Sequence, residues 1–89
     1  MKSGIGLIAN ERQEQITKHQ QSILDDVNEN PDGRLVNGAI RLLRLEEPPE
    51  GWDIDRFNKM KSKSRKERII IAGALLAAEL DRIIYLEKH

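Results

Sequence analysis

The chain has no cysteine, and aromatic residues make up only 3% of its 89 positions. The lack of cysteine excludes disulfide bonds and thiolate metal sites, which is typical of proteins kept in a reducing compartment. No apolar run reaches the roughly 18 uncharged residues that a membrane span needs, and no signal-peptide pattern opens the sequence. We therefore expect a cytoplasmic protein without a membrane partner.

Neither sign of charge prevails, since Lys and Arg total 15 and Asp and Glu also total 15. Without a net positive field, nucleic acid is not expected as a partner. The hydrophobic residues, 38% of the chain, are mainly aliphatic and stand beside 34% charged residues, a composition typical of helical proteins. The length fits one domain near the small end of those that fold alone.

Apolar spacing predicts four helices, at about residues 5–26, 34–45, 53–60 and 65–87. In the first, the apolar face is expected to consist of Ile5, Ile8, Ala9, Ile16 and Ile23, which recur at three- and four-residue spacing. Short connections between the helices imply an antiparallel arrangement. The predicted fold is therefore all-α, a small antiparallel bundle of three to four helices.

Local signals mark the boundaries of these helices. The segment Pro31–Gly33 predicts a turn, and Pro48–Pro49 should end the second helix because proline cannot continue the helical ladder. Asp53 is placed to cap the third helix. Ser64 and Glu67 fit the S-x-x-E capping box at the start of the last helix.

The last helix is apolar on almost every side through residues 69–80 (IIIAGALLAAEL). A surface helix of a small monomer carries one apolar stripe, so this helix must be covered on more than one face. We therefore expect the bundle to be completed by self-association, as a homodimer or homotetramer. Gly73 costs roughly 1 kcal/mol relative to alanine, which favours close packing of a neighbour there, although the small residues around it are also good helix formers.

Two acidic positions are candidate metal ligands. Glu11 and Glu14 are neighbours on the surface of the first helix, and paired carboxylates suit Mg²⁺. The alternative is a solvated charged face balanced by Arg12 and Lys18. Glu79 lies among apolar residues of the last helix, so it must be protonated, ion-paired or bound to a metal.

For Glu79, Arg82 and Arg68 are the candidate ion-pair partners, whereas Asp81 is expected to face solvent. Acids at a helix C-terminus oppose the helix dipole, which favours a functional role for Asp26 beside Asp25. His19 falls on the apolar side of the first helix and is expected to be a buried, hydrogen-bonded histidine.

The basic run at residues 59–68 (KMKSKSRKER) precedes and enters the last helix. Because helix N-termini attract anions, Lys61, Lys63 and Arg65 are candidate phosphate-binding residues. A solvated loop or a weak nucleic-acid patch would give the same composition.

Two blocks carry a resemblance, residues 4–16 (GIGLIANERQEQI) and 66–82 (KERIIIAGALLAAELDR), with Asp26 and Gly51–Trp52 between them. They resemble a family of short phage and prophage proteins with an ERQxQI first helix and an AGALxxAEIDR last helix. That family looks related to the all-α nucleoside triphosphate pyrophosphohydrolases of the MazG type. The similarity spans nearly the whole chain.

The resemblance implies a Mg²⁺-dependent enzyme that converts a nucleoside triphosphate to a monophosphate and pyrophosphate. It implies Glu11, Glu14, Asp26 and Glu79 as metal ligands, with Glu11 and Glu14 also in the catalytic role. The departures are Leu24 and Arg34, which stand where the family has Glu, and Glu79-x-Asp81 in place of E-x-x-D. The alternative is therefore a catalytically inactive MazG-like module that keeps the helical fold and the oligomer.

Overall fold

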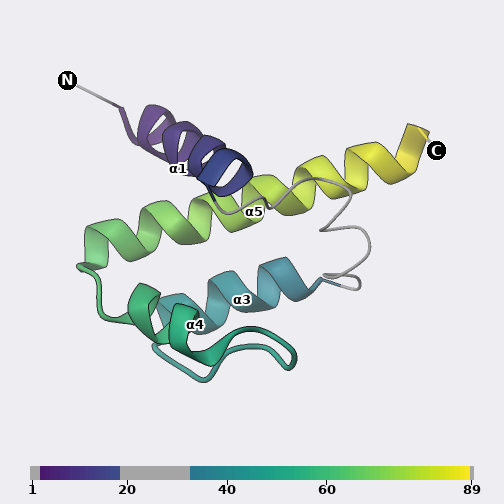
Figure 1. The fold of residues 1–89 in the computed structure, drawn as a ribbon. Coiled ribbons are helices and arrows are strands. Elements are labelled where there is room, and N and C mark those ends of the chain that lie inside the picture. Colours follow the sequence, from purple (N-terminus) through teal and green to yellow (C-terminus); the bar gives the residue numbers. More distant parts are fainter. Residues whose placement is uncertain (1–2, 19–32, 89) are drawn as a thin grey trace.

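The computed structural model describes residues 3–18 and 33–88, which form four α-helices and no strand (Figure 1). These are α1 (Gly4–Lys18), α3 (Arg34–Leu43), α4 (Ile54–Lys61) and α5 (Arg65–Lys88). The predicted all-helical fold class is confirmed. Residues 19–26, which the sequence assigned to the first helix, lie outside the described residues, as do His19, Ile23 and Pro31.

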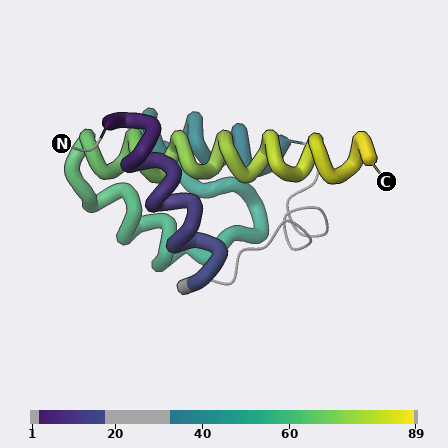
Figure 2. Tube along the Cα trace, turned by 90° about the horizontal axis from the view of Figure 1, so that it is seen from above, coloured from purple at the N-terminus to yellow at the C-terminus, as the bar shows by residue number. Residues whose placement is uncertain are grey.

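The longest helix, α5, is the element on which the others are assembled. Both α1 and α3 pack against it (Figure 1), α3 running alongside in the opposite direction and α1 crossing it obliquely (Figure 2). The shorter α4 contacts both α3 and α5. α1 and α3 lie on opposite sides of α5 (Figure 1). The described helices leave part of the surface of α5 exposed between them.

An apolar core fills the space between α3, α4 and α5. On α3, the buried positions Leu35, Ala39 and Leu42 follow the four- and three-residue spacing of one helical face. The core comprises Leu35, Ala39, Leu42, Phe57, Ile71, Ala72, Leu75 and Ala78, with Trp52 and Met60 packed against it. The spacing of these aliphatic residues predicts which side of α3 faces the core.

The tryptophan packs across α3 at a position where that helix has no side chain. A Cβ atom added to Gly38 would lie 2.2 Å from a ring carbon of Trp52. The same indole meets Phe57 edge to face, with ring centroids 5.9 Å apart, an arrangement that aromatic pairs favour. Gly38 therefore allows the aromatic pair to close one end of the core.

A second glycine brings α1 against α5. A Cβ atom added to Gly73 would lie 2.6 Å from Cδ1 of Ile8. The expectation that Gly73 serves close packing is confirmed, and the neighbour it admits is the side chain of Ile8.

The predicted apolar face of α1 is wrong in most of its members. Ile5 is 84% exposed and Ile16 is also exposed, whereas Arg12 and Gln15 are buried. Positions 8, 12 and 15 also share a helical face, and this is the face that α1 turns toward α5. Tertiary contacts, including an ion pair described below, outweighed the weak apolar periodicity of this helix.

The helix ends follow the local signals, with one exception. Asp53 Oδ1 accepts a hydrogen bond from Arg56 N at 2.9 Å, and Ser64 Oγ accepts one from Glu67 N at 3.2 Å. α3, however, ends at Leu43, before the prolines. Leu45 adopts a positive φ of 58°, and Glu46 N donates to Arg41 O at 2.8 Å, which together form a Schellman motif.

Candidate functional site

The surface where α1 crosses α5 includes polar side chains beside Ile8. Arg12 is only 7% exposed, and its Nε donates to Oδ2 of Asp81 at 3.2 Å. Gln15, one turn further along α1, is 3% exposed. Asp81, which was expected to face solvent, keeps a side chain that is 39% exposed and also pairs with Arg12. The sequence did not predict this pair, in which the acid compensates the charge of a buried guanidinium from another helix.

Glu79 is the most buried carboxylate of α5, with 7% of the residue exposed. Both of its oxygens accept hydrogen bonds from Arg82, Oε1 from Nε and Oε2 from Nη2, the latter at 3.3 Å. The ion pair with Arg82 that the sequence offered as one alternative is confirmed. A two-point pair of this kind compensates the desolvation of both charges without any bound ion.

The two acids of α1 differ in exposure. Glu11 is half-buried and Glu14 is exposed. Among residues 3–18 and 33–88, no three His, Cys, Asp or Glu side chains come together as a group able to hold a metal ion. Asp26, the fourth predicted ligand, lies outside the described residues.

The donor atoms can be compared with what Mg²⁺ requires. Carboxylate oxygens are the right chemistry for this ion, but Glu79 has both oxygens bonded to the Arg82 guanidinium. A metal bound by Glu79 would have to displace that guanidinium. The described residues therefore do not by themselves fit a magnesium site.

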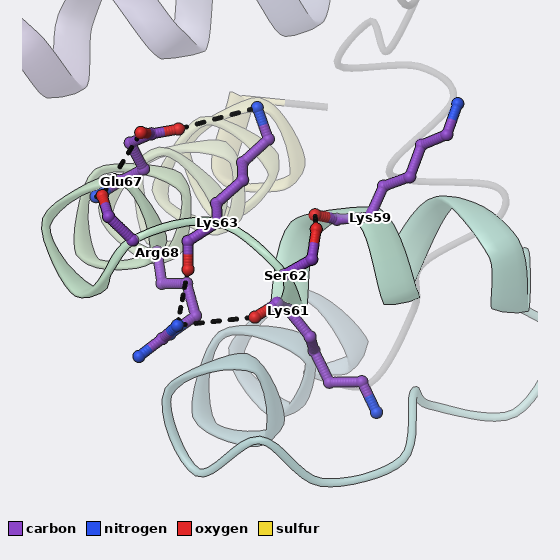
Figure 3. Close-up of polar contacts among 7 residues, drawn as sticks. Lys59, Lys61, Ser62, Lys63, Glu67 and Arg68 are labelled. Atoms are coloured by element: carbon purple, nitrogen blue, oxygen red, sulfur yellow. Dashed lines mark hydrogen bonds and ion pairs between the residues drawn. The ribbon is translucent and has the colours of Figure 1, made fainter.

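The basic run forms the corner between α4 and α5. Arg68 Nη1 donates to Lys63 O at 2.6 Å and to Lys61 O at 3.4 Å (Figure 3). Ser62 Oγ donates to Lys59 O at 2.7 Å in the same corner. These bonds satisfy carbonyl groups at the end of α4, so Arg68 has a structural role here.

The cations of this corner do not gather around one point. Lys59, Lys61 and Lys63 extend in different directions (Figure 3). Lys61 Nζ lies 5.9 Å from the Phe57 ring centroid, and Lys63 Nζ lies 3.9 Å from an oxygen of Glu67. Arg65 is exposed in the first turn of α5. Lys61 and Lys63, two of the three predicted phosphate-binding residues, therefore have partners within the chain.

One side of α5 presents a row of large aliphatic residues to solvent. On a helical wheel of 100° per residue, these residues fall within about 60° of Ile69. They are Ile69, Leu76, Leu80, Ile83 and Ile84, between 41% and 61% exposed, and we call them the α5 stripe. The sequence predicted that α5 is apolar all round, but only the packing of α1, α3 and α4 shows which residues remain uncovered.

No helix within residues 3–18 and 33–88 is long and apolar enough to cross a membrane. Comparisons with known proteins return no match, since no family model, curated protein or solved structure is significantly similar to this chain. The resemblance to MazG-like proteins accordingly stays a prediction.

Proposed function

We propose that this protein is a self-associating helical module in which a second copy of the chain covers the α5 stripe. The carrying observation is the exposure of five large aliphatic residues in one row along a single helix. From Ile69 to Ile84 the row is roughly 22 Å long at 1.5 Å per residue. Within this length Ile8 of α1 packs on Gly73, so the exposed residues form two groups, Ile69 and the four from Leu76 to Ile84. Exposed apolar residues gathered on one side of a helix mark an interaction site in a small protein.

The size of the stripe also suits pairing between two copies. Full burial of a Leu or Ile side chain is worth about 1.5–3 kcal/mol, so covering the exposed half of one is worth about 1 kcal/mol. Two copies contribute ten such side chains, against association costs of about 4–15 kcal/mol. The gain of about 10 kcal/mol is of the same size as these costs, so the population of the proposed dimer depends on concentration.

Replacement of Leu76 by Glu tests this proposal. Leu76 lies in the middle of the α5 stripe, so Leu76→Glu should convert the dimer to a monomer in sedimentation equilibrium while helical circular dichroism is retained. The matched control is Leu43→Glu, because Leu43 is 48% exposed on α3, away from the stripe. A wild-type chain that stays monomeric at high micromolar concentration would refute the proposal.

A second candidate function is Mg²⁺-dependent hydrolysis of nucleoside triphosphates to monophosphates and pyrophosphate. The observation in its favour is that α1, which carries Glu11 and Glu14, packs directly against α5. On α5 the acid that α1 contacts is Asp81, and Glu79 lies about 200° from it around the helix. In this proposal Glu11, Glu14 and Glu79 act with Asp26 as oxygen ligands, and Lys61, Lys63 and Arg65 contact the phosphates. Glu79 must then exchange its bonds to Arg82 for the metal.

Incubation with a panel of nucleoside triphosphates and Mg²⁺, followed by measurement of pyrophosphate, tests the second candidate. Glu79→Gln should abolish release and remove any stabilisation of melting by Mg²⁺. Glu87→Gln is the control, since Glu87 is an exposed acid of the same helix. No pyrophosphate from the wild-type protein, together with melting that is indifferent to Mg²⁺, would eliminate this candidate.

A further inference from the structure

α1 is the helix that contributes least to the apolar interior. Within the described residues, no member of the apolar core comes from α1, and its Leu7 and Ile8 are only half-buried. The residues that α1 does bury are polar, Arg12 and Gln15. The core between α3, α4 and α5 would therefore stay intact if α1 were released from α5.

Burial of these polar side chains makes the docked position of α1 unfavourable in part. Arg12 is withdrawn from water and pairs with Asp81, whose side chain is 39% exposed. Gln15 Oε1 is also buried, and none of the described residues donates a hydrogen bond to it. A buried acceptor without a donor loses the free energy of its bonds to water. Since few apolar contacts offset this loss, we expect α1 to release at a lower free energy than global unfolding.

α1 lies directly beside the α5 stripe. On the helical wheel, the stripe extends from about 40° on one side of Ile69 to about 60° on the other. Gly73, against which Ile8 packs, falls within this arc at about 40°, and Asp81 falls at about 120° on the same side. α1 therefore crosses the stripe at Gly73 and covers α5 beyond its edge.

The side of α5 that α1 covers is itself largely apolar. Ile70, Gly73, Ala74 and Ala77 fall between about 40° and 140° on this side of the wheel. Ala74 is fully buried although it is not part of the core between α3, α4 and α5. Release of α1 would widen the exposed apolar arc of α5 from about 100° to about 180°. The two exposed groups of the stripe would then join into one surface.

We propose that α1 is an autoinhibitory element that limits self-association through the α5 stripe. In its docked position, α1 separates Ile69 from the group between Leu76 and Ile84 and leaves a second copy only a narrow surface. Release of α1 opens a surface along which α5 of a second copy can pack. This inference rests on the proposed self-association and adds its regulation. A second copy that binds only the released form lowers the observed affinity in proportion to the fraction released.

Replacement of Ile8 by serine tests the inference, because it removes the apolar anchor of α1 without altering the sequence of α5. Ile8→Ser should speed hydrogen exchange of the α1 amides while those of α3 stay protected. Sedimentation equilibrium should show self-association at least tenfold tighter, the factor expected if the released form makes up about a tenth or less of the wild-type protein. Ile5→Ser is the matched control, since Ile5 is 84% exposed on the same helix.

A charge exchange repeats the test through the other contact of α1. Asp81→Arg places like charges at the contact with Arg12, so it should also release α1 and tighten self-association. Its combination with Arg12→Glu restores an ion pair between the two helices and should return both measurements toward the wild type. Asp55→Arg is the control for the change of net charge, because Asp55 is an exposed acid of α4.

The outcomes separate this inference from the proposed self-association. Release of α1 that leaves the dimer equally strong or weaker would overturn the autoinhibitory role and leave self-association standing. Amides of α1 that exchange only on global unfolding, in both Ile8→Ser and Asp81→Arg, would overturn that role as well. No association in the wild type or in any variant would overturn both. A monomeric wild type beside a dimeric Ile8→Ser would support the autoinhibitory role and contradict only the wild-type dimer.

Discussion

Replacement of Gly38 by alanine should destabilise the protein, although alanine is the better helix former. The Cβ atom would lie 2.2 Å and 2.6 Å from two ring carbons of Trp52, whereas carbon atoms in contact are about 3.5–4.0 Å apart. The indole would therefore have to retreat by roughly 1.5 Å, given that contact distance. It cannot do so freely, because its ring also packs edge to face on Phe57.

The magnitude follows from two opposing terms. Alanine gains about 1 kcal/mol over glycine inside a helix. Overpacking a rigid site costs about 1–3 kcal/mol, and expulsion of the indole from its site would cost more, toward the 3–5 kcal/mol of a tryptophan truncation. After subtraction of the propensity gain, we expect Gly38→Ala to lower the free energy of unfolding by up to about 2 kcal/mol if the indole only shifts, and by about 2–4 kcal/mol if it is expelled. The melting temperature should fall by roughly 4–8 °C for each kcal/mol.

Trp52 is the only tryptophan of the chain, so its fluorescence reports the packing directly. Urea unfolding followed by fluorescence and by circular dichroism should show a lower midpoint for Gly38→Ala, with native emission shifted toward longer wavelength. Gly4→Ala is the control, because an added Cβ there meets nothing within 4 Å. A Gly38→Ala protein as stable as the wild type, with unchanged emission, would refute the close approach of Trp52 to α3.

Three further predictions test other contacts. Gly73→Ala should destabilise the protein by up to about 2 kcal/mol, because Ile8 must move, and proteolysis within α1 should become faster in native buffer. Asp81→Asn should cost about 1–2 kcal/mol by removing the acid beside the buried Arg12; a double-mutant cycle with Arg12→Met should then show a coupling energy, and additive effects would contradict the pair. Leu45→Gly should raise the free energy of unfolding by about 0.5–1 kcal/mol, because glycine adopts a positive φ without strain. An unchanged midpoint of urea unfolding would argue against that conformation.

Local signals predicted several features that depend on neighbours in the chain. The caps at Asp53 and Ser64 follow from side chains that reach backbone amides three residues away. The pair between Glu79 and Arg82 likewise joins residues one helical turn apart. The Schellman end of α3 was missed because Leu45 takes a conformation usually reserved for glycine.

The buried face of α1 shows where such signals fail. Its apolar residues are too sparse to select one face, so Ile5 and Ile16 are exposed while Arg12 and Gln15 are buried. Contacts with α5 determine which face of α1 is buried, because Gly73 leaves space for Ile8 and Asp81 pairs with Arg12. Arg12 and Asp81 are 69 positions apart in the chain, so the apolar periodicity of either helix cannot predict their contact.

Some properties of the last helix likewise follow from the sequence, and others depend on the tertiary structure. The sequence by itself determined that α5 is a helix, that it is apolar on more than one side, and that its glycine serves close packing. These properties depend on side-chain spacing along one helix, which the order of residues specifies completely. Only the tertiary structure decided that α1, α3 and α4 leave the stripe from Ile69 to Ile84 exposed and that Glu79 and Asp81 each pair with an arginine. Those outcomes depend on how separate helices pack, because burial and charge compensation are set by the neighbours that folding brings together.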